Sequence, residues 1–341
     1  MSLVPLVETT RGVDVKSATV ENIHYGAIAV VDVNGRLLHY AGDPYFQTYT
    51  RSALKPFQAF PLLEDDGLSQ LGLEAADLAL FCASHSGEPR HTERIAGILA
   101  MLGLSEADLQ CGCHVPSYYA TVGERPPEGM RWTQLHHNCS GKHTGMLAWC
   151  KLHGASHNDY LSHQHPLQVR IREGLAPMFK HPPERFSEGI DGCSAPNFSM
   201  PLASLAHFYA RVAKGSEDAE HGALFEKIFE AMTGYPELVS GIGRTDLAYM
   251  SGAPGDWISK AGADGVQVVA SREAGLGIAI KIADGAPRAL HTAMVATLEA
   301  VGIATEKSRG LTEPWREPKI RNYKGLAVGV IRPRVTLTST K

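Results

Sequence analysis

The sequence predicts an α/β fold in which one antiparallel sheet, built from both ends of the chain, is covered by helices. Three observations support this prediction. Residues 23–43 read as two strands around a turn, and 266–270 with 277–285 read as a second hairpin near the other end. Residues 159–235, between them, have the apolar spacing of helices. We therefore expect a helical part inserted into a sheet.

Composition excludes several classes of protein. The 341 residues are 44% hydrophobic and 20% charged, which is ordinary for a globular α/β protein and argues against disorder. The net charge of -4 and the lack of a dense Lys/Arg run argue against nucleic-acid binding. No apolar run reaches the roughly 18 residues that a membrane helix needs. We expect a soluble, cytoplasmic protein that binds a small molecule.

The first half of the chain alternates between strand and helix signals. The turn at Val33-Asn34-Gly35 is a strong hairpin cue. A short buried strand is predicted for 77–83, followed by a polar loop. Helices are predicted for three further segments: Ser52 to about Leu63, 91–104, and 145–154, which ends at Gly154.

The second half begins with amphipathic segments and returns to strands. Residues 201–213 and 222–232 each have an apolar face, which predicts helices. After the hairpin at 266–285, residues 287–303 are predicted to form a helix and 326–333 a last strand.

Ser52 and Lys55 stand three positions apart in RSALKPFQAF, with Pro56 directly after the lysine. Residues at this spacing share one face of a helix, so the hydroxyl can approach the amine. Proline is tolerated only in a first turn, so the helix should begin near Ser52 and leave it at the positive end of the dipole. The same spacing also suits the first turn of an ordinary core helix. The segment alone leaves both interpretations open.

A lysine accepts a proton only when it is neutral, and a free lysine, with a pKa of about 10.4, is almost fully charged at pH 7. Burial and a second ammonium group nearby both favour the neutral form. Lys260, just ahead of a predicted strand, stands where serine acyl enzymes of the penicillin-recognising type carry such a group. An exposed lysine in a turn is the alternative. Lys281 is a rival, but Ile280 and Ile282 should alternate inward and leave it outward.

Two further stretches carry polar side chains typical of a site. In CASHSGEPRH (82–91), Ser84 is a candidate second hydroxyl at the end of a predicted strand, although a serine-rich turn explains it equally well. In HHNCSGKHTGM (136–146), histidines, Cys139 and Lys142 gather just before a helix. With Cys193 they could form a zinc-like site, although no CxxC or HxxxH spacing supports it. The six cysteines are too sparse for a disulfide scaffold.

Several long motifs in a fixed order resemble the bacterial class 3 L-asparaginases, the Rhizobium-type or thermolabile asparaginase II family. They extend from about residue 6 to 333 and comprise LVETTRG, RSALKPFQAFPL, CASHSGEPRH, HHNCSGKHTGM, DGCSAPNFSMPL, SKAG and NYKGLAVGVIRP. The resemblance implies a single domain over residues 1–341 with the fold of serine β-lactamases and glutaminases. Its helical part would span roughly 85–235, and the protein would be a homodimer.

The resemblance also implies the reaction and its residues. Members hydrolyse L-asparagine to L-aspartate and ammonia, and the matching catalytic positions, which form two Ser-Lys pairs, are Ser52, Lys55, Ser84 and Lys260. The family's metal motif places one zinc ion per chain on Cys139, Lys142 and Cys193. A lysine must be neutral to bind a metal, which makes this ligand set unusual.

These residues give a specific mechanism. Ser52, deprotonated through Lys55, attacks the side-chain amide, ammonia leaves, and water releases aspartate. Arg51 and Asp191 are candidates for binding the α-carboxylate and α-ammonium groups of the substrate, with ordinary surface charges as the alternative. The rival hypotheses are a glutaminase or β-lactam acyl hydrolase on the same fold, and a zinc-holding protein without activity.

Overall fold

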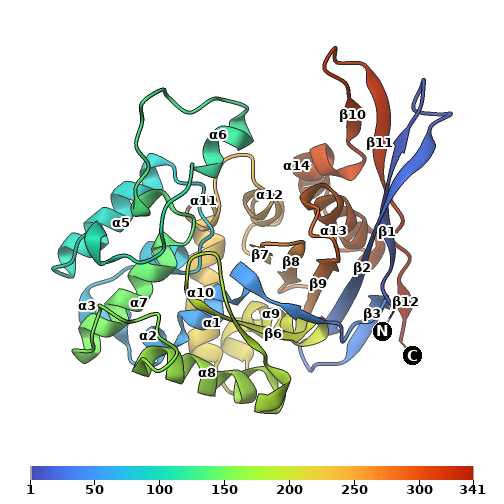
Figure 1. Ribbon diagram of the computed structural model, residues 1–341. Helices are drawn as coiled ribbons and strands as arrows, with labels where there is room; N and C mark the ends of the chain where they lie inside the picture. Colours follow the sequence, from blue (N-terminus) through green and yellow to red (C-terminus); the bar gives the residue numbers. More distant parts are fainter. Residues whose placement is uncertain (1, 341) are drawn as a thin grey trace. The chain divides into compact units, whose positions relative to one another are not determined.

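The computed structural model describes residues 2–340 and divides into two compact units (Figure 1). Unit 1 contains the two ends of the chain and one central segment: Met1–Arg51, Met200–Ala213 and Ala248–Lys341. Unit 2 contains Ser52–Ser199 and Lys214–Leu247. The predicted helical part, residues 85–235, falls mostly in unit 2, but unit 2 begins earlier, at Ser52.

Unit 1 is built on an antiparallel sheet. Within the described residues it has nine strands, with the main order β10-β11-β1-β2-β9-β8-β7, while β3 pairs with β2 and β12. Strands from both ends of the chain are neighbours, which confirms the predicted α/β fold with an antiparallel sheet. The strands are β1 (Val4–Arg11), β2 (Thr19–Asp32), β3 (Leu37–Ala41), β7 (Trp257–Gly262), β8 (Val266–Ser271), β9 (Leu276–Ile282), β10 (Lys319–Arg321), β11 (Ala327–Pro333) and β12 (Thr338–Ser339). The short strand β4 (Gln47–Tyr49) also belongs to this unit.

The two predicted hairpins of the sheet are both present. Strands β2 and β3 are joined at Gly35, whose φ of +85° is a conformation that glycine adopts without strain. Strands β8 and β9 pair in antiparallel fashion from Val266↔Lys281 to Ser271↔Leu276. Lys281 is partly exposed between the buried Ile280 and Ile282, as the alternation predicted.

Helices pack on both faces of this sheet. On one face α13 (Pro287–Val301) shares a buried cluster with Ile28 and Ile280 (Figure 1). On the other face α9 (Leu202–Lys214) lies so close to β9 that a Cβ on Gly277 would sit 2.1 Å from the Ala206 carbonyl oxygen. Successive side chains of a strand point to opposite faces of the sheet. The large residues of β9, such as Ile280, therefore pack toward α13, and the small ones, such as Gly277, allow the close approach of α9. Two more helices involve this unit, α14 (Glu306–Arg316) and α12 (Thr245–Gly252), of which α12 begins in unit 2.

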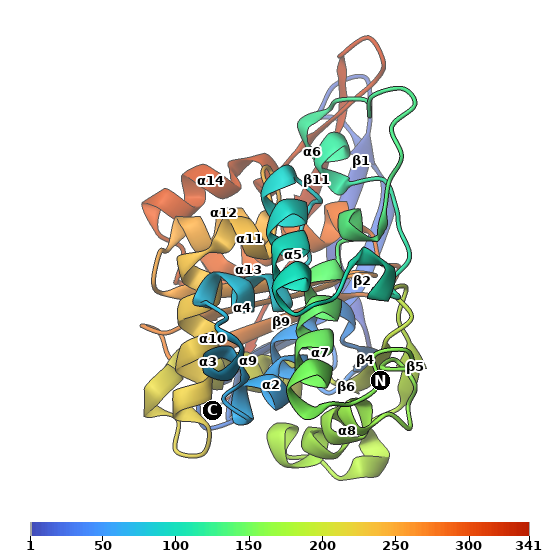
Figure 2. The same cartoon turned by 90° about the vertical axis from the view of Figure 1, so that its left-hand side faces the viewer.

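Unit 2 is mainly helical, and α7 is its central helix (Figure 2, green). This helix contacts α2, α3, α4, α5 and α8. Gly141, in its first turn, permits the closest approach, because a Cβ there would lie 2.2 Å from the Leu80 carbonyl oxygen. The elements are α1 (Lys55–Gln58), α2 (Phe60–Glu64), α3 (Gly67–Leu71), α4 (Ala75–Phe81), α5 (Pro89–Met101), α6 (Ser117–Val122), α7 (Ser140–His153), α8 (Pro166–Phe179), α10 (Gly222–Gly234), α11 (Pro236–Val239), and the hairpin β5 (Glu188–Ile190) with β6 (Pro196–Pro201).

Two local predictions in unit 2 need correction. Residues 77–83, predicted as a strand, belong mostly to α4, which begins with a capping box between Glu74 and Asp77. Packing of α4 against α7, α10 and other helices buries nearly every residue, so its helical period is hidden in a continuous apolar run. Helix α7 begins at Ser140 rather than near residue 145, so Lys142 is inside the helix.

No helix within residues 2–340 combines the length and the apolar character that crossing a bilayer requires.

Candidate active site

Ser52 and Lys55 lie where a 3₁₀ turn, Arg51–Leu54, runs into α1. Lys55 is the first residue of α1, and Pro56 occupies the first turn, where its missing N–H has no helical partner. Ser52 is 8% exposed and Lys55 is 1% exposed. The helix start predicted from the proline is confirmed to within a turn, and both side chains face the interior.

The amine of Lys55 is directed at the segment that contains Ser84. Its Nζ donates to Ser84 Oγ at 3.0 Å, to the Ala83 carbonyl oxygen, and at 3.4 Å to the Asn138 carbonyl oxygen. Within residues 2–340 it makes no hydrogen bond to Ser52 Oγ. Three acceptors match the three N–H donors of an ammonium group. In this structure Lys55 is therefore hydrogen-bonded to Ser84, the second serine of the predicted set.

The backbone of Ser84 is fixed on both sides. Its N–H donates to the Val239 carbonyl oxygen at 2.9 Å, and its own carbonyl oxygen accepts from Arg244 Nη1 at 2.6 Å. Burial lowers the pKa of Arg244, but an arginine remains charged at neutral pH. Nothing in the sequence pattern pointed to Arg244, because its contact depends on two segments that are 160 residues apart.

Glu88 secures the same loop at its other end. Its Oε1 accepts from Ser86 Oγ at 2.6 Å and from the Ile242 N–H at 3.0 Å. Gly241, with φ +149°, lies so close that a Cβ there would meet Ser86 Oγ at 1.8 Å. The segments 84–88 and 239–244 therefore form one connected structure around the serine.

The buried histidine of this loop is structural. His85 Nδ1 accepts from the Gly87 N–H at 3.2 Å, so its Nε2 carries the proton and donates to Ser140 Oγ, 2.9 Å away. Burial, followed by the charges of nearby groups including His91 and Lys55, holds the pKa of His85 well below its usual value. A neutral imidazole with both nitrogens engaged positions the loop and does not act as a base.

Cys139, Lys142 and Cys193 come together in the interior of unit 2. Cys139 precedes α7, Lys142 is in its first turn, and Cys193 lies in the turn between β5 and β6. Lys142 Nζ donates to Cys193 Sγ at 3.0 Å, and the Cys139 thiol donates to the same sulfur. All three side chains are buried. The three residues of the predicted metal set therefore meet although they come from two distant segments.

Cys193 is the sulfur of this cluster that accepts hydrogen bonds from both Lys142 and Cys139. The hydrogen bond from Cys139, aided by Lys142 and by contact with His143, lowers the pKa of Cys193 far below that of a free thiol despite burial. The same hydrogen bond, together with burial, raises the pKa of Cys139. Burial acts to lower the pKa of Lys142, but the two sulfurs outweigh it and raise that pKa. The hydrogen bonds from Lys142 and Cys139 thus both favour the charged form of the Cys193 sulfur.

The turn that presents Cys193 is tightly defined. The Asp191 N–H donates to the Ala195 carbonyl oxygen at 2.9 Å, and the Ser194 N–H donates to the Asp191 carbonyl oxygen at 2.9 Å. Ser194 has φ +68°, an uncommon value for a residue with a side chain. Asp191 is partly exposed and contributes to the high pKa of Lys142, so it lies near the cluster.

No group of three or more His, Cys, Asp or Glu side chains is arranged to hold a metal ion within the described residues. The set of Cys139, Lys142 and Cys193 combines two thiols with an amine, so it is not a group of that kind. All six cysteines are free thiols.

The two remaining predicted residues belong to unit 1. Lys260 precedes β8, the strand predicted at 266–270, and itself lies inside another strand, β7, opposite Val268. It is fully buried, and its Nζ donates to the Ala261 carbonyl oxygen at 2.8 Å, which excludes the exposed-turn alternative. Arg51 has φ +50° and forms an ion pair with Asp264.

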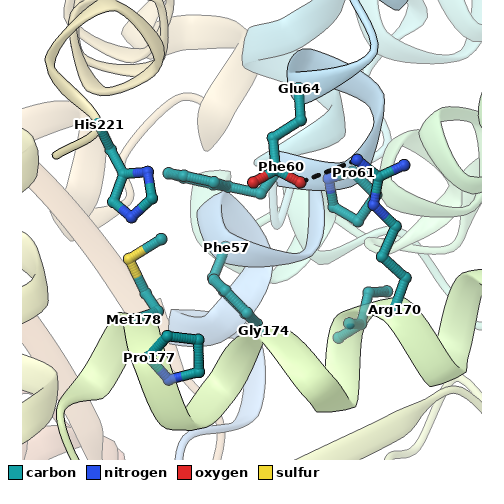
Figure 3. Close-up of a pocket in the computed structure, with 10 residues that line it drawn as sticks. Phe57, Phe60, Pro61, Glu64, Arg170, Gly174, Pro177, Met178 and His221 are labelled. Atoms are coloured by element: carbon teal, nitrogen blue, oxygen red, sulfur yellow. Dashed lines mark hydrogen bonds and ion pairs between the residues drawn. The ribbon is translucent and has the colours of Figure 1, made fainter.

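A small pocket of about 80 Å³ lies in unit 2 beside α1, α2 and α8 (Figure 3). Phe57, Phe60 and Met178 provide much of its apolar wall, and the ion pair of Glu64 with Arg170, 3.0 Å long, lies at its edge. Its lining includes no serine, lysine or cysteine. The pocket is therefore not part of the candidate site.

Solved structures similar to this chain are distant relatives. Mglu in its native form is 14% identical with a TM-score of 0.43, and the match covers 81% of this chain and 64% of that chain. The chain thus spans less than two thirds of the length of Mglu. A β-lactamase from Mycobacterium bovis is 13% identical with a TM-score of 0.42, over 81% of this chain and 94% of that chain.

The family of the chain follows from its sequence. No curated protein matches the chain. The family model described as L-asparaginase II matches residues 7–333, which include every candidate residue described above. Because this match covers nearly the whole sequence, the chain belongs to the L-asparaginase II family.

Proposed function

We propose that the protein hydrolyses L-asparagine to L-aspartate and ammonia with a serine nucleophile, as a member of the class 3, Rhizobium-type branch of its family. Family membership supports asparagine as the substrate. The hydrogen bond of 3.0 Å from Lys55 Nζ to Ser84 Oγ supports Ser-Lys chemistry, because a buried lysine on a serine hydroxyl is a typical arrangement for activating a nucleophile.

In the proposed reaction Ser52 Oγ attacks the side-chain amide carbon while its proton passes to Lys55. The C–N bond of the tetrahedral intermediate then breaks, and the nitrogen takes up the proton from Lys55 and leaves as ammonia. A water molecule attacks the resulting ester, releases aspartate and returns the proton to the serine. Lys55 accepts this proton only as a free amine. Its extra proton would leave beforehand through the hydroxyl of Ser84, which takes up one proton from Lys55 and releases its own to solvent.

Ser84 is a second candidate for the nucleophile. Its hydroxyl contacts Lys55 directly, which favours it, whereas Ser52 rests on the family motif and its place beside α1. Acid quenching during turnover, followed by peptide mapping, distinguishes the two, because the aspartyl ester adds its mass to the peptide of one serine. An ester on the Ser84 peptide would reassign the nucleophile.

Zinc is part of the proposal, with one ion per chain held by Cys139, Lys142 and Cys193. The donor set fits a soft divalent cation, since two cysteine sulfurs and an amine meet there and a cation can replace the protons that Cys139 and Lys142 direct at Cys193. Bound zinc would supply a fixed positive charge that joins the β5–β6 turn to α7. The reaction itself is carried by the serines and Lys55.

The remaining assignments complete the proposal. Lys260, in the other unit, joins the reaction through the family motif alone, as the partner of Ser84. Asp191 would bind the α-ammonium group of asparagine. Arg51 would bind the α-carboxylate, for which it must exchange its ion pair with Asp264 for the substrate. We also infer a cytoplasmic homodimer.

The test is ammonia release from L-asparagine, L-glutamine and a chromogenic β-lactam under identical conditions. The proposal expects asparagine to give by far the highest kcat/KM. Faster hydrolysis of glutamine or of the β-lactam would favour the rival enzymes, and no hydrolysis of any of them would favour a zinc-holding protein without activity.

A further inference from the structure

His143 is a buried imidazole that directly follows Lys142 in α7. Imidazole is among the commonest zinc ligands and needs no deprotonation at pH 7, whereas lysine binds a metal only after losing a proton. Beside the thiols of Cys139 and Cys193, His143 would therefore be the expected third ligand. The contacts of its ring explain why it is not.

Tyr160 connects His143 to the backbone through its hydroxyl. The Gln110 N–H, which can only donate, lies 3.0 Å from Tyr160 Oη, and Tyr160 Oη lies 2.7 Å from His143 Nδ1. Tyr160 is fully buried, so its phenol proton needs an acceptor inside the protein. Within residues 2–340 the hydroxyl contacts only these two groups. Tyr160 therefore donates its proton to Nδ1.

The ring of His143 is then left with one possible tautomer. An imidazole with one nitrogen that accepts a hydrogen bond is neutral and carries a single proton, on its other nitrogen. Because Nδ1 accepts from Tyr160, that proton is on Nε2. Nε2 is buried and has no well-aligned hydrogen-bond partner among the described residues. Cys193 and Lys142 are among the groups whose charges act on this ring.

We propose that Tyr160 locks His143 in the tautomer with its proton on Nε2, and that this lock withholds the imidazole from a metal and leaves Lys142 as the nitrogen ligand. A ligating nitrogen must present a lone pair, and both lone-pair positions of His143 are excluded, one by the Tyr160 proton and one by its own proton. Lys142 Nζ, 3.0 Å from Cys193 Sγ, is the nitrogen that remains. This proposal does not depend on the hydrolytic reaction.

The lock is tested first without metal. Two-bond ¹H–¹⁵N correlation spectra of chelator-treated protein report the tautomer of each histidine, and the His143 signals are identified by their loss in His143→Gln. The proposal expects the Nε2–H tautomer in the wild type and its weakening or reversal in Tyr160→Phe. His85, whose Nδ1 accepts from a backbone N–H, should remain Nε2–H in both and serves as the internal control. A wild-type His143 protonated on Nδ1 would overturn the proposal.

The second test measures zinc affinity and asks whether a second substitution restores the binding that a first one removes. Lys142→Ala should weaken zinc binding by about tenfold or more, because the locked imidazole cannot replace the amine. Adding Tyr160→Phe releases the ring, so the double variant should bind zinc about tenfold more tightly than Lys142→Ala and should show imidazole scattering in zinc X-ray absorption spectra. Lys142→Ala with Tyr249→Phe, a buried tyrosine of unit 1, is the matched control and should show no rescue.

Imidazole scattering already present in the wild type, or no rescue in the double variant, would contradict the lock. If no variant binds zinc, the zinc assignment fails, and the tautomer measured without metal still decides the role of Tyr160.

Discussion

Lys55 and Ser84, which are 29 residues apart, are joined by a hydrogen bond of 3.0 Å from the amine to the hydroxyl. Lys55 shares a sequence motif with Ser52, yet its described contacts go to the loop of Ser84 and to the Asn138 carbonyl oxygen. One buried amine therefore connects two serine segments of unit 2. A substitution that shifts the Ser84 loop should therefore lower the rate of the reaction without unfolding the protein.

Arg244 provides such a change, because its guanidinium holds the Ser84 carbonyl oxygen. Arg244→Gln removes this donor, and a small displacement of a reacting group can lower a rate by about 100-fold. We expect kcat for asparagine to fall at least tenfold with KM nearly unchanged, and Arg244→Lys to recover part of the loss. The measurement is steady-state kinetics of ammonia release.

Arg94→Gln is the control for general destabilisation, since Arg94 forms ion pairs with Glu74 and Asp77 in the same unit. It should lower Tm without lowering kcat. If Arg244→Gln also changes only Tm, the positioning role is wrong.

Removal of either thiol tests the metal set. Cys139→Ser and Cys193→Ser should each reduce zinc below about one tenth of an equivalent per chain, because loss of a ligand reduces metal affinity by large factors. Cys150→Ser, a buried cysteine of α7 outside the cluster, should retain the metal. Elemental analysis of purified, untreated protein is the measurement. An active wild-type protein without zinc would refute the assignment.

The sequence predicted the structural features that depend on local spacing. Pro56 marked the start of α1, and the hairpin cues gave the antiparallel sheet. Arg244 and Tyr160 act through contacts between distant segments, which no local pattern reports. Helix α4 was misread because the interior is apolar on all of its sides, so burial removed the periodicity that identifies a helix.

Asp65 should give a pH-dependent contribution to stability. Its Oδ2 accepts hydrogen bonds from Trp149 Nε1, His153 Nε2 and Arg170 Nη1. Burial alone would raise its pKa, but the hydrogen bonds from Arg170 and His153 outweigh burial and hold the pKa below its usual value. The carboxylate therefore stabilises the folded state above about pH 4, and this stabilisation is lost as the pH falls through the folded-state pKa.

Urea unfolding of Asp65→Asn tests this contribution. At pH 7 the variant should lose about 1 kcal/mol or more of unfolding free energy, and the difference from wild type should shrink below pH 4. Asp159→Asn, at an exposed position, should differ little at either pH. A loss for Asp65→Asn that is the same at pH 3 and pH 7 would show that its charge is not responsible.

Two glycines within helices should respond differently to alanine. A Cβ on Gly97 in α5 meets no atom within 4 Å, so Gly97→Ala should raise the unfolding free energy by about 0.5 to 1 kcal/mol through helix propensity alone. A Cβ on Gly174 in α8 would lie 3.2 Å from Phe57 Cζ, at the pocket of Figure 3. Gly174→Ala should therefore gain less. Thermal unfolding checks both, and a destabilised Gly97→Ala would contradict the helical environment described for it.

The most direct test of the central claim is the initial rate of ammonia release from L-asparagine by wild-type protein, Ser52→Ala and Lys55→Ala, with folding checked by circular dichroism. The wild type should release ammonia, and each variant should lose nearly all of this activity, because residues that act as one unit do not contribute additively. A folded Ser52→Ala that keeps more than about a tenth of the wild-type rate would contradict the assignment of the nucleophile. A wild-type protein that releases no ammonia would contradict the proposed reaction itself.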